Sequence, residues 1–135
     1  MAHSLLKCLG MIKILVVDDD QDMCEILSDF LEEEGYTVMT AYDGESALDE
    51  IKTGRYDLLI VDYRLHTIDG LEVLAIARQL NTSLTAIMMT AFGSDATRLH
   101  AKTLGAYEFV EKPFDMERMV GVVKQALSKK EIACM

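Results

Sequence analysis

The sequence is poor in cysteine and in basic residues, and it lacks a long hydrophobic run. Its three cysteines, Cys8, Cys24 and Cys134, show neither a Cys-x-x-Cys pair nor a Cys/His spacing, which argues against structural zinc and indicates a reducing compartment. Its 13 basic and 23 acidic residues give a net charge of −10, so the surface should repel nucleic acid and anionic lipid. No apolar run reaches the roughly 18 residues that span a bilayer. These absences predict a cytoplasmic protein that binds neither nucleic acid nor membrane directly.

Apolar residues are nevertheless numerous enough for one hydrophobic core. Of the 135 residues, 50% are hydrophobic and 27% are charged, a balance that excludes disorder and low-complexity sequence. A chain of this length has room for one domain. We expect residues 11–130 to form that domain, residues 1–10 to be a flexible N-terminal extension, and residues 131–135 to be a C-terminal tail.

Apolar runs alternate along the chain with stretches of helical periodicity. The runs are typical of strands buried on both faces and cover 12–17, 37–42, 58–61, 86–89 and 109–111. The stretches with apolar residues at helical spacing cover 23–31, 43–51, 70–80, 94–104 and 116–127. Five such units predict an α/β fold, namely a single doubly wound, flavodoxin-like domain. Its five-stranded parallel sheet should have the order 2-1-3-4-5, with helices on both faces.

Two of the predicted helices differ in the strength of their apolar faces. The first carries five apolar residues at helical spacing: Met23, Ile26, Leu27, Phe30 and Leu31. The helix over 94–104 has a weak apolar stripe that consists mainly of Ala96, Leu99 and Leu104. A weak stripe indicates marginal packing and local mobility.

Polar residues follow four of the predicted strands, at their carboxyl ends. Asp18 and Asp19 follow the first strand, Asp62 the third, Thr90 the fourth and Lys112 the fifth. In the order 2-1-3-4-5 these ends meet at the edge where open parallel sheets bind ligands. Two carboxylates about 4 Å apart repel each other by ~4 kcal/mol at an effective dielectric constant of about 20. Three carboxylates beside one lysine therefore predict a divalent cation, and oxygen ligands suit Mg²⁺.

A purely structural role is the alternative for this acidic run. Asp18 and Asp19 could form a solvated turn, although strand ends in such folds commonly carry function. For Asp20 and Asp22 the structural interpretation is favoured, because helix N-termini accommodate aspartate well.

Four motifs occur in order along the chain: ILVVDDD, LLIVDYRLHTIDG, AIMMTAFG and FVEKPF. On these motifs, nearly the whole of residues 11–129 resembles the receiver domain of bacterial two-component response regulators. The resemblance implies that Asp62 accepts a phosphoryl group from a histidine kinase or a histidine phosphotransfer protein. It also implies that Asp18, Asp19, Asp62 and the backbone carbonyl of Arg64 hold Mg²⁺.

The same resemblance implies a phosphorylation-dependent signalling switch. Thr90 and Lys112 would contact the phosphoryl oxygens, and Phe109 would be the switch aromatic that fills the space left when Thr90 moves inward. The domain would assist its own phosphorylation and dephosphorylation without being an enzyme. Taken singly, Thr90 could also be an ordinary strand residue, Phe109 a core aromatic and Lys112 a surface charge.

The expected docking surface lies next to Thr90 and Phe109. It comprises the helix 94–104, the strand 109–111 and the last helix, and its partner would be an output domain or a second copy in a homodimer. Arg98, His100 and Lys102 form a basic cluster there, which suits an acidic partner or a second copy. These three residues could equally be ordinary solvated charges.

Two positions deserve comparison with the family pattern. Many receivers have proline four residues after the acceptor, where this chain has His66. The resemblance implies a cis peptide bond between Lys112 and Pro113, whereas only about 5–6% of X–Pro bonds are cis in general.

His3, His66 and His100 show no metal-binding spacing, and we expect each of them at the exposed surface.

A haloacid-dehalogenase-type phosphohydrolase is the main alternative. It would use Asp18 as the nucleophile and Asp20 as a second carboxylate, and would leave Asp62 without a role. Against it, no acidic pair follows Lys112 at a further strand end, and the length leaves no room for a cap domain. A flavodoxin is a third alternative, but its first loop should hold phosphate with backbone amides rather than with acidic side chains.

Overall fold

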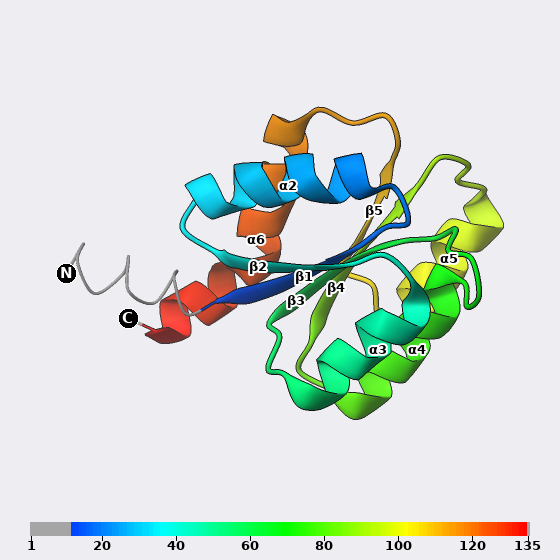
Figure 1. The fold of residues 1–135 in the computed structure, drawn as a ribbon, viewed down its shortest axis with the longest axis horizontal. Coiled ribbons are helices and arrows are strands. Elements are labelled where there is room, and N and C mark those ends of the chain that lie inside the picture. The colour runs from blue at the N-terminus through cyan, green and yellow to red at the C-terminus, as the bar shows by residue number, and fades with distance from the viewer. Residues whose placement is uncertain (1–11, 135) are drawn as a thin grey trace.

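The computed structural model describes residues 12–134, with side chains to residue 129. The five strands are β1 (Lys13–Val17), β2 (Thr37–Ala41), β3 (Leu58–Asp62), β4 (Thr85–Thr90) and β5 (Glu108–Glu111). The five helices are α2 (Gln21–Glu33), α3 (Gly44–Thr53), α4 (Gly70–Leu80), α5 (Asp95–Thr103) and α6 (Met116–Cys134). Strands and helices alternate strictly along this part of the chain (Figure 1).

The strands form one parallel sheet in the order β2-β1-β3-β4-β5. The pairing places Val17 beside Val61, Asp62 beside Met89 and Thr90 beside Glu111, so the carboxyl ends of the strands meet at one edge. The predicted fold class and strand order are confirmed.

Helices cover both faces of the sheet, with α2 and α6 on one face and α3, α4 and α5 on the other (Figure 1). Each face has its own buried cluster. The α2 and α6 side chains in the first cluster are Cys24, Leu27, Leu31, Met119, Val123 and Leu127. The helical side chains in the second are Ala47, Leu48, Ile51, Val73, Leu74, Ala77 and Ala101. The central strand β3 is buried along its whole length, as expected for a strand covered on both faces.

Individual residues mark the start of α2 and the ends of α2 and α5. The side chain of Asp20 accepts hydrogen bonds from the backbone N–H groups of Asp22 and Met23, which makes it the N-cap of α2, as predicted. Just after α2 and α5, Gly35 and Gly105 adopt φ angles of 100° and 101°, a left-handed conformation that favours glycine.

The burial pattern of α2 corrects the predicted helix face. Ile26 and Phe30 are 47% and 41% exposed, whereas Cys24 and Ser28 are buried beside Leu27. Apolar residues at helical spacing occupy more than one side of this helix, so periodicity alone did not define the side that faces the sheet.

The burial pattern of α5 corrects the apolar stripe that was predicted for the helix over 94–104. Leu99 is 69% exposed and Ala96 is also exposed, while Leu104, just beyond the helix, is half-buried. Within α5, all of which is described, Ala101 is the buried residue. The small side chain of Ala101 lets the helix approach the sheet, and the larger Leu99 points to solvent.

The structure tests the expected domain limits at the C-terminal end of the chain but not at the N-terminal end. The expected extension over 1–10 lies outside the described residues, as does residue 135. The backbone of α6 continues as a helix to Cys134, through most of the segment expected as a tail. Among the described helices, none combines the length and the apolar character that crossing a membrane requires.

Candidate functional site

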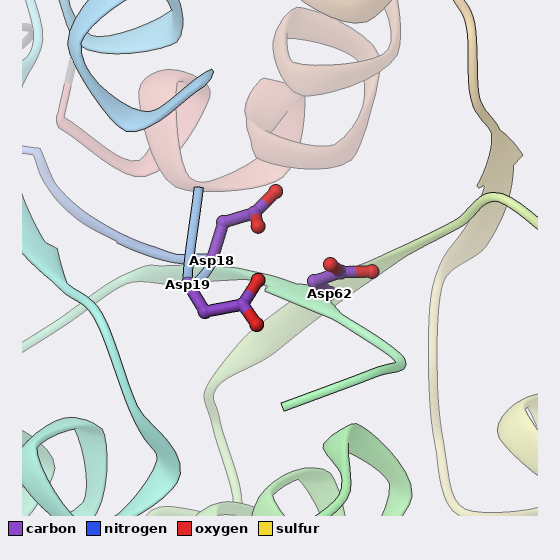
Figure 2. Close-up of side chains that lie close together, drawn as sticks. All are labelled: Asp18, Asp19 and Asp62. Atoms are coloured by element: carbon purple, nitrogen blue, oxygen red, sulfur yellow. The ribbon is translucent and has the colours of Figure 1, made fainter. Parts of the chain in front are cut away.

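Three aspartates lie together at the carboxyl edge of the sheet (Figure 2). Asp18 and Asp19 directly follow β1, and Asp62 is the last residue of the neighbouring strand β3. One carboxylate oxygen from each of the three lies within 4.8 Å of the others, which is close enough for one metal ion to contact all three. Parallel pairing of β1 and β3 explains this convergence of residues far apart in the sequence.

Lys112 joins the two buried carboxylates of this group. Its Nζ donates to Asp18 Oδ2 at 2.7 Å and to Asp62 Oδ2 at 3.2 Å. The Lys112 side chain is 17% exposed, while Asp18 and Asp62 are buried. One ammonium group thus faces two carboxylates at a site that is largely removed from water, which strengthens the attraction between them.

The backbone around Asp18 holds this carboxylate in place. Its Oδ1 accepts a hydrogen bond from the backbone N–H of Asp20 at 3.0 Å, and its own N–H donates to the carbonyl of Ala41 at 3.2 Å. Its carbonyl oxygen accepts from Cys24 Sγ at 3.4 Å, on the first turns of α2. The start of α2 therefore fixes the position of Asp18.

The backbone after Asp62 turns sharply so that α4 begins against the end of β3. Gly70 N–H donates to the carbonyl oxygen of Tyr63 at 2.7 Å. A Cβ atom at position 70 would lie 2.2 Å from the carbonyl oxygen of Asp62, so only glycine allows this approach. The loop over 63–69 is thereby folded back beside the acidic group.

Burial and charge shift the pKa values of the central groups. Burial, with the negative charge of Asp18, raises the pKa of Asp62 to about 6, although Lys112 opposes the shift. Burial disfavours the charge of Lys112, but its hydrogen bond to Asp18 and the charge of Asp62 raise the pKa of this lysine overall. Burial and Asp18 also raise the pKa of the Cys24 thiol to about 12, so this cysteine stays protonated and unreactive.

The donor set fits a hard divalent cation. Asp18, Asp19 and Asp62 supply carboxylate oxygens, and one lysine leaves the group with a net negative charge. Asp19 is partly exposed, so water can complete the coordination that Mg²⁺ prefers. The predicted fourth ligand is the carbonyl of Arg64, which lies two residues after Asp62 in the folded-back loop. The Arg64 side chain is exposed, and its guanidinium lies 5.4 Å from the centre of the Phe92 ring.

Thr90 and Phe109 are both buried on the side of the site formed by β4 and β5. Thr90 Oγ1 accepts a hydrogen bond from the backbone N–H of Phe92 at 3.1 Å. The carbonyl of Thr90 accepts from the N–H of Lys112 at 2.7 Å, so the two strand ends are joined directly. The Lys112–Pro113 bond is cis, as the resemblance predicted.

Two contacts at the site were not anticipated from the sequence. His66 is 80% exposed, as expected of a surface histidine, yet its Nε2 lies 3.2 Å from Asp19 Oδ2. Arg98 was expected in a basic cluster open to partners, but it pairs with Glu111 at 2.7 Å. Its guanidinium also lies 5.0 Å from the centre of the Phe109 ring. Both contacts join segments far apart in the sequence, so local pattern carries no signal for them.

Comparisons with known proteins identify the family of this chain. Residues 14–124 match the family described as the response regulator receiver domain. The chain belongs to this family. It is 38% identical over 119 residues to the transcriptional regulatory protein ZraR of Salmonella typhimurium, covering 88% of this chain and 27% of that protein. The chain therefore spans about a quarter of the length of this relative.

Solved receiver structures share the fold closely. A CheY-like receiver domain from Methanospirillum hungatei superposes with a TM-score of 0.86 at 28% identity, covering 90% of this chain and 98% of that one. The beryllofluoride-activated NtrC4 receiver domain dimer gives a TM-score of 0.82 at 34% identity, covering 87% of this chain and 97% of that one. This receiver is accordingly a domain of two-component signalling, and the comparisons give no support to the phosphohydrolase alternative.

Proposed function

We propose that this receiver is a phosphorylation-dependent switch in which Asp62 accepts a phosphoryl group from a histidine kinase or a histidine phosphotransfer protein. The observation that carries the proposal is the convergence of Asp18, Asp19 and Lys112 on the Asp62 carboxylate. Lys112 beside Asp62 would offer one fixed positive charge to the negative charge that develops on a phosphoryl group. As an acceptor domain, the chain assists its own phosphorylation and dephosphorylation rather than turning over a separate substrate, and we infer that it works in the cytoplasm.

The acidic group would hold Mg²⁺ through Asp18, Asp19, Asp62 and the Arg64 carbonyl. When bound, Mg²⁺ would neutralise charge on the phosphoryl oxygens. Because the pKa of Asp62 is about 6, its carboxylate is ionised and able to bind a cation near pH 7.

The transfer step needs positioning more than strong nucleophilicity, because phosphoryl transfer has a loose transition state. An oxygen of ionised Asp62 attacks phosphorus as the bond from phosphorus to the donor imidazole nitrogen breaks, and the imidazole leaves with its electron pair. Lys112 stabilises charge on the phosphoryl oxygens, and the Thr90 hydroxyl donates a hydrogen bond to one of them.

The signal would leave through the surface formed by α5, β5 and α6. Thr90 moves toward the phosphoryl group, and Phe109 occupies the space beside it, so a local charge change alters packing at this surface. The exposed Leu99 supplies an apolar contact for an output domain or a second copy. The dimeric NtrC4 receiver supports a homodimer as one form of this contact.

Labelling with acetyl phosphate, a small phosphoryl donor, tests the proposal. We expect Mg²⁺-dependent labelling that mass spectrometry maps to Asp62 and that Asp62→Asn abolishes. Asp49→Asn, which changes an exposed aspartate of α3, is the matched control and should label normally. Labelling at Asp18, or undiminished labelling of Asp62→Asn, would overturn the proposal and favour a phosphohydrolase.

A further inference from the structure

Arg98 makes three contacts with the same strand, all from one guanidinium group. Its Cζ lies 5.0 Å from the centre of the Phe109 ring, Nη2 donates to Glu111 Oε1 at 2.7 Å, and Nη1 lies 3.4 Å from the Phe109 carbonyl oxygen. Phe109 and Glu111 are two residues apart on β5 and so point to the same face of the sheet. A planar guanidinium suits this arrangement, because it can stack on a ring and donate at its edge together.

The Phe109 ring is also confined by the loop that follows β4. A Cβ atom at Gly93 would lie 2.9 Å from Phe109 Cε1, 3.1 Å from Glu111 Oε1 and 3.3 Å from Thr90 Cγ2. The space beside the Gly93 Cα is therefore bounded by the ring, the carboxylate and the threonine, and a larger residue there would press on all three. Arg98 and Gly93 together enclose Phe109, which is 1% exposed.

These contacts matter more for α5 than they would for a well-buried helix. Within α5, whose residues are all described, Ala101 is the buried side chain, and Leu99 points to solvent. Arg98 therefore adds two hydrogen bonds and a cation–π contact to the limited apolar packing that joins this helix to β5. A change in the position of the Phe109 ring would be transmitted to α5 through the same guanidinium.

We propose that Arg98 is a positioning residue of the switch, which holds the Phe109 ring in its buried position beside Thr90 and ties α5 to β5. This proposal rests on the proposed function, in which Thr90 and Phe109 relay the state of Asp62. In the proposed function, Thr90 moves toward a phosphoryl group on Asp62 and leaves space that the buried Phe109 ring fills, so Arg98 and the phosphoryl group would stabilise the same form. By linkage, loss of Arg98 must then weaken binding of a phosphoryl analogue at Asp62.

The test measures the affinity of the full chain for beryllofluoride in the presence of Mg²⁺, by fluorine NMR of the bound fluoride. Arg98→Ala should weaken binding by about 2- to 30-fold, the range that a single cation–π contact carries. Arg98→Lys keeps a cation but loses the planar group, so it should retain only part of the affinity. Arg118→Ala is the matched control. Arg118 lines a surface hollow together with Arg98, Phe109 and Glu111, but the guanidinium that lies over the ring is that of Arg98, so the variant should bind as the parent does.

A second background separates a role in the switch from a general structural effect. In Phe109→Leu, which removes the ring, Arg98→Ala should have no further effect on beryllofluoride affinity. Fluorophenylalanine labelling gives an independent readout, because the chain has only four phenylalanines. The Phe109 signal, assigned by its loss in Phe109→Leu, should shift toward that of a solvent-exposed ring in Arg98→Ala.

Two results would overturn the role of Arg98. One is unchanged affinity in Arg98→Ala, and the other is an equal loss of affinity in the Phe109→Leu background. Either result leaves the proposed function intact as long as the parent protein binds beryllofluoride and Asp62→Asn does not. Failure of the parent protein itself to bind would instead count against Asp62 as the acceptor.

Discussion

Helices α2 and α5 cover opposite faces of one sheet and are attached to it in different ways. Helix α2 has 13 residues, begins at the Asp20 cap and buries Cys24, Leu27, Ser28 and Leu31. Helix α5 has nine residues, of which Ala101 is the buried one, and it is joined to β5 through the exposed pair of Arg98 and Glu111.

This difference in packing matches the different positions of the two helices relative to the acidic group and to the proposed switch residues. The start of α2 holds Asp18 through backbone contacts and the Cys24 thiol, so strong packing there keeps the acidic group in place. Helix α5 lies beside Thr90 and Phe109, where the proposed switch would produce movement. Regions with few buried apolar contacts open most readily, and switching elements come from such regions. In the proposed function, a firmly held acidic centre thus lies beside a less firmly packed helix that would respond to it.

The largest expected effect is the difference between matched leucine truncations in the two helices. Leu27→Ala removes a fully buried side chain and should destabilise the protein by about 2–5 kcal/mol. Leu99→Ala removes an exposed side chain and should change stability by less than about 0.5 kcal/mol. Urea unfolding of both variants checks this. Similar losses in the two variants would show that α5 is packed as firmly as α2.

Removing the Lys112 ammonium group from the acidic centre should lower the stability of the protein almost as much as Leu27→Ala does. Lys112→Met leaves Asp18 and Asp62 buried without their cation. We expect a loss of about 3 kcal/mol at pH 7, the low end of the range for buried ion pairs, because the Lys112 side chain is 17% exposed. The loss should shrink at pH 5, where Asp62 takes up a proton. Lys102→Met, at an exposed lysine of α5, is the control. A loss in Lys112→Met that does not depend on pH would mean that the lysine acts through packing alone.

A smaller effect should appear as a pH dependence of stability. Because the pKa of Asp62 is raised to about 6, the folded protein binds more protons than the unfolded chain between about pH 4 and pH 6. Stability of the metal-free protein should therefore fall as pH rises through this window, by at most about 3 kcal/mol from Asp62 alone. Urea unfolding in chelator should show this decrease relative to Asp62→Asn. Parallel pH profiles of the two proteins would contradict the raised pKa.

The smallest expected effect concerns Asp19, the most exposed of the three carboxylates. Asp19→Asn relieves repulsion and should stabilise the metal-free fold by about 1 kcal/mol. Saturating Mg²⁺ should raise the Tm of the parent protein, and raise that of Asp19→Asn much less. Thermal unfolding with and without Mg²⁺ measures both. Equal responses to Mg²⁺ would remove Asp19 from the proposed ligands.

The sequence predicted the architecture well because its strongest signals are local. The β-branched runs and the strand–helix alternation determine a parallel sheet, and parallel strands bring their carboxyl ends to one edge. The proximity of Asp18, Asp62 and Lys112 follows from that topology without knowledge of side-chain contacts.

The features that the sequence did not predict depend on long-range packing. Ile26 and Phe30 share helical spacing with buried leucines, so only the assembled sheet decides which side of α2 it covers. Contacts of His66 with Asp19 and of Arg98 with Phe109 join separate loops and strands, and no local pattern encodes such pairs. Polar contacts across segments are thus where the structure adds most to the sequence.

Hydrogen exchange with and without beryllofluoride and Mg²⁺ tests the central contrast most directly. The account predicts slow exchange in α2 under both conditions, faster exchange in α5, and a change on binding that extends to Thr90, Phe109 and residues 95–103. A change confined to the loops around Asp18, Asp62 and Lys112, with α5 unaffected, would contradict it.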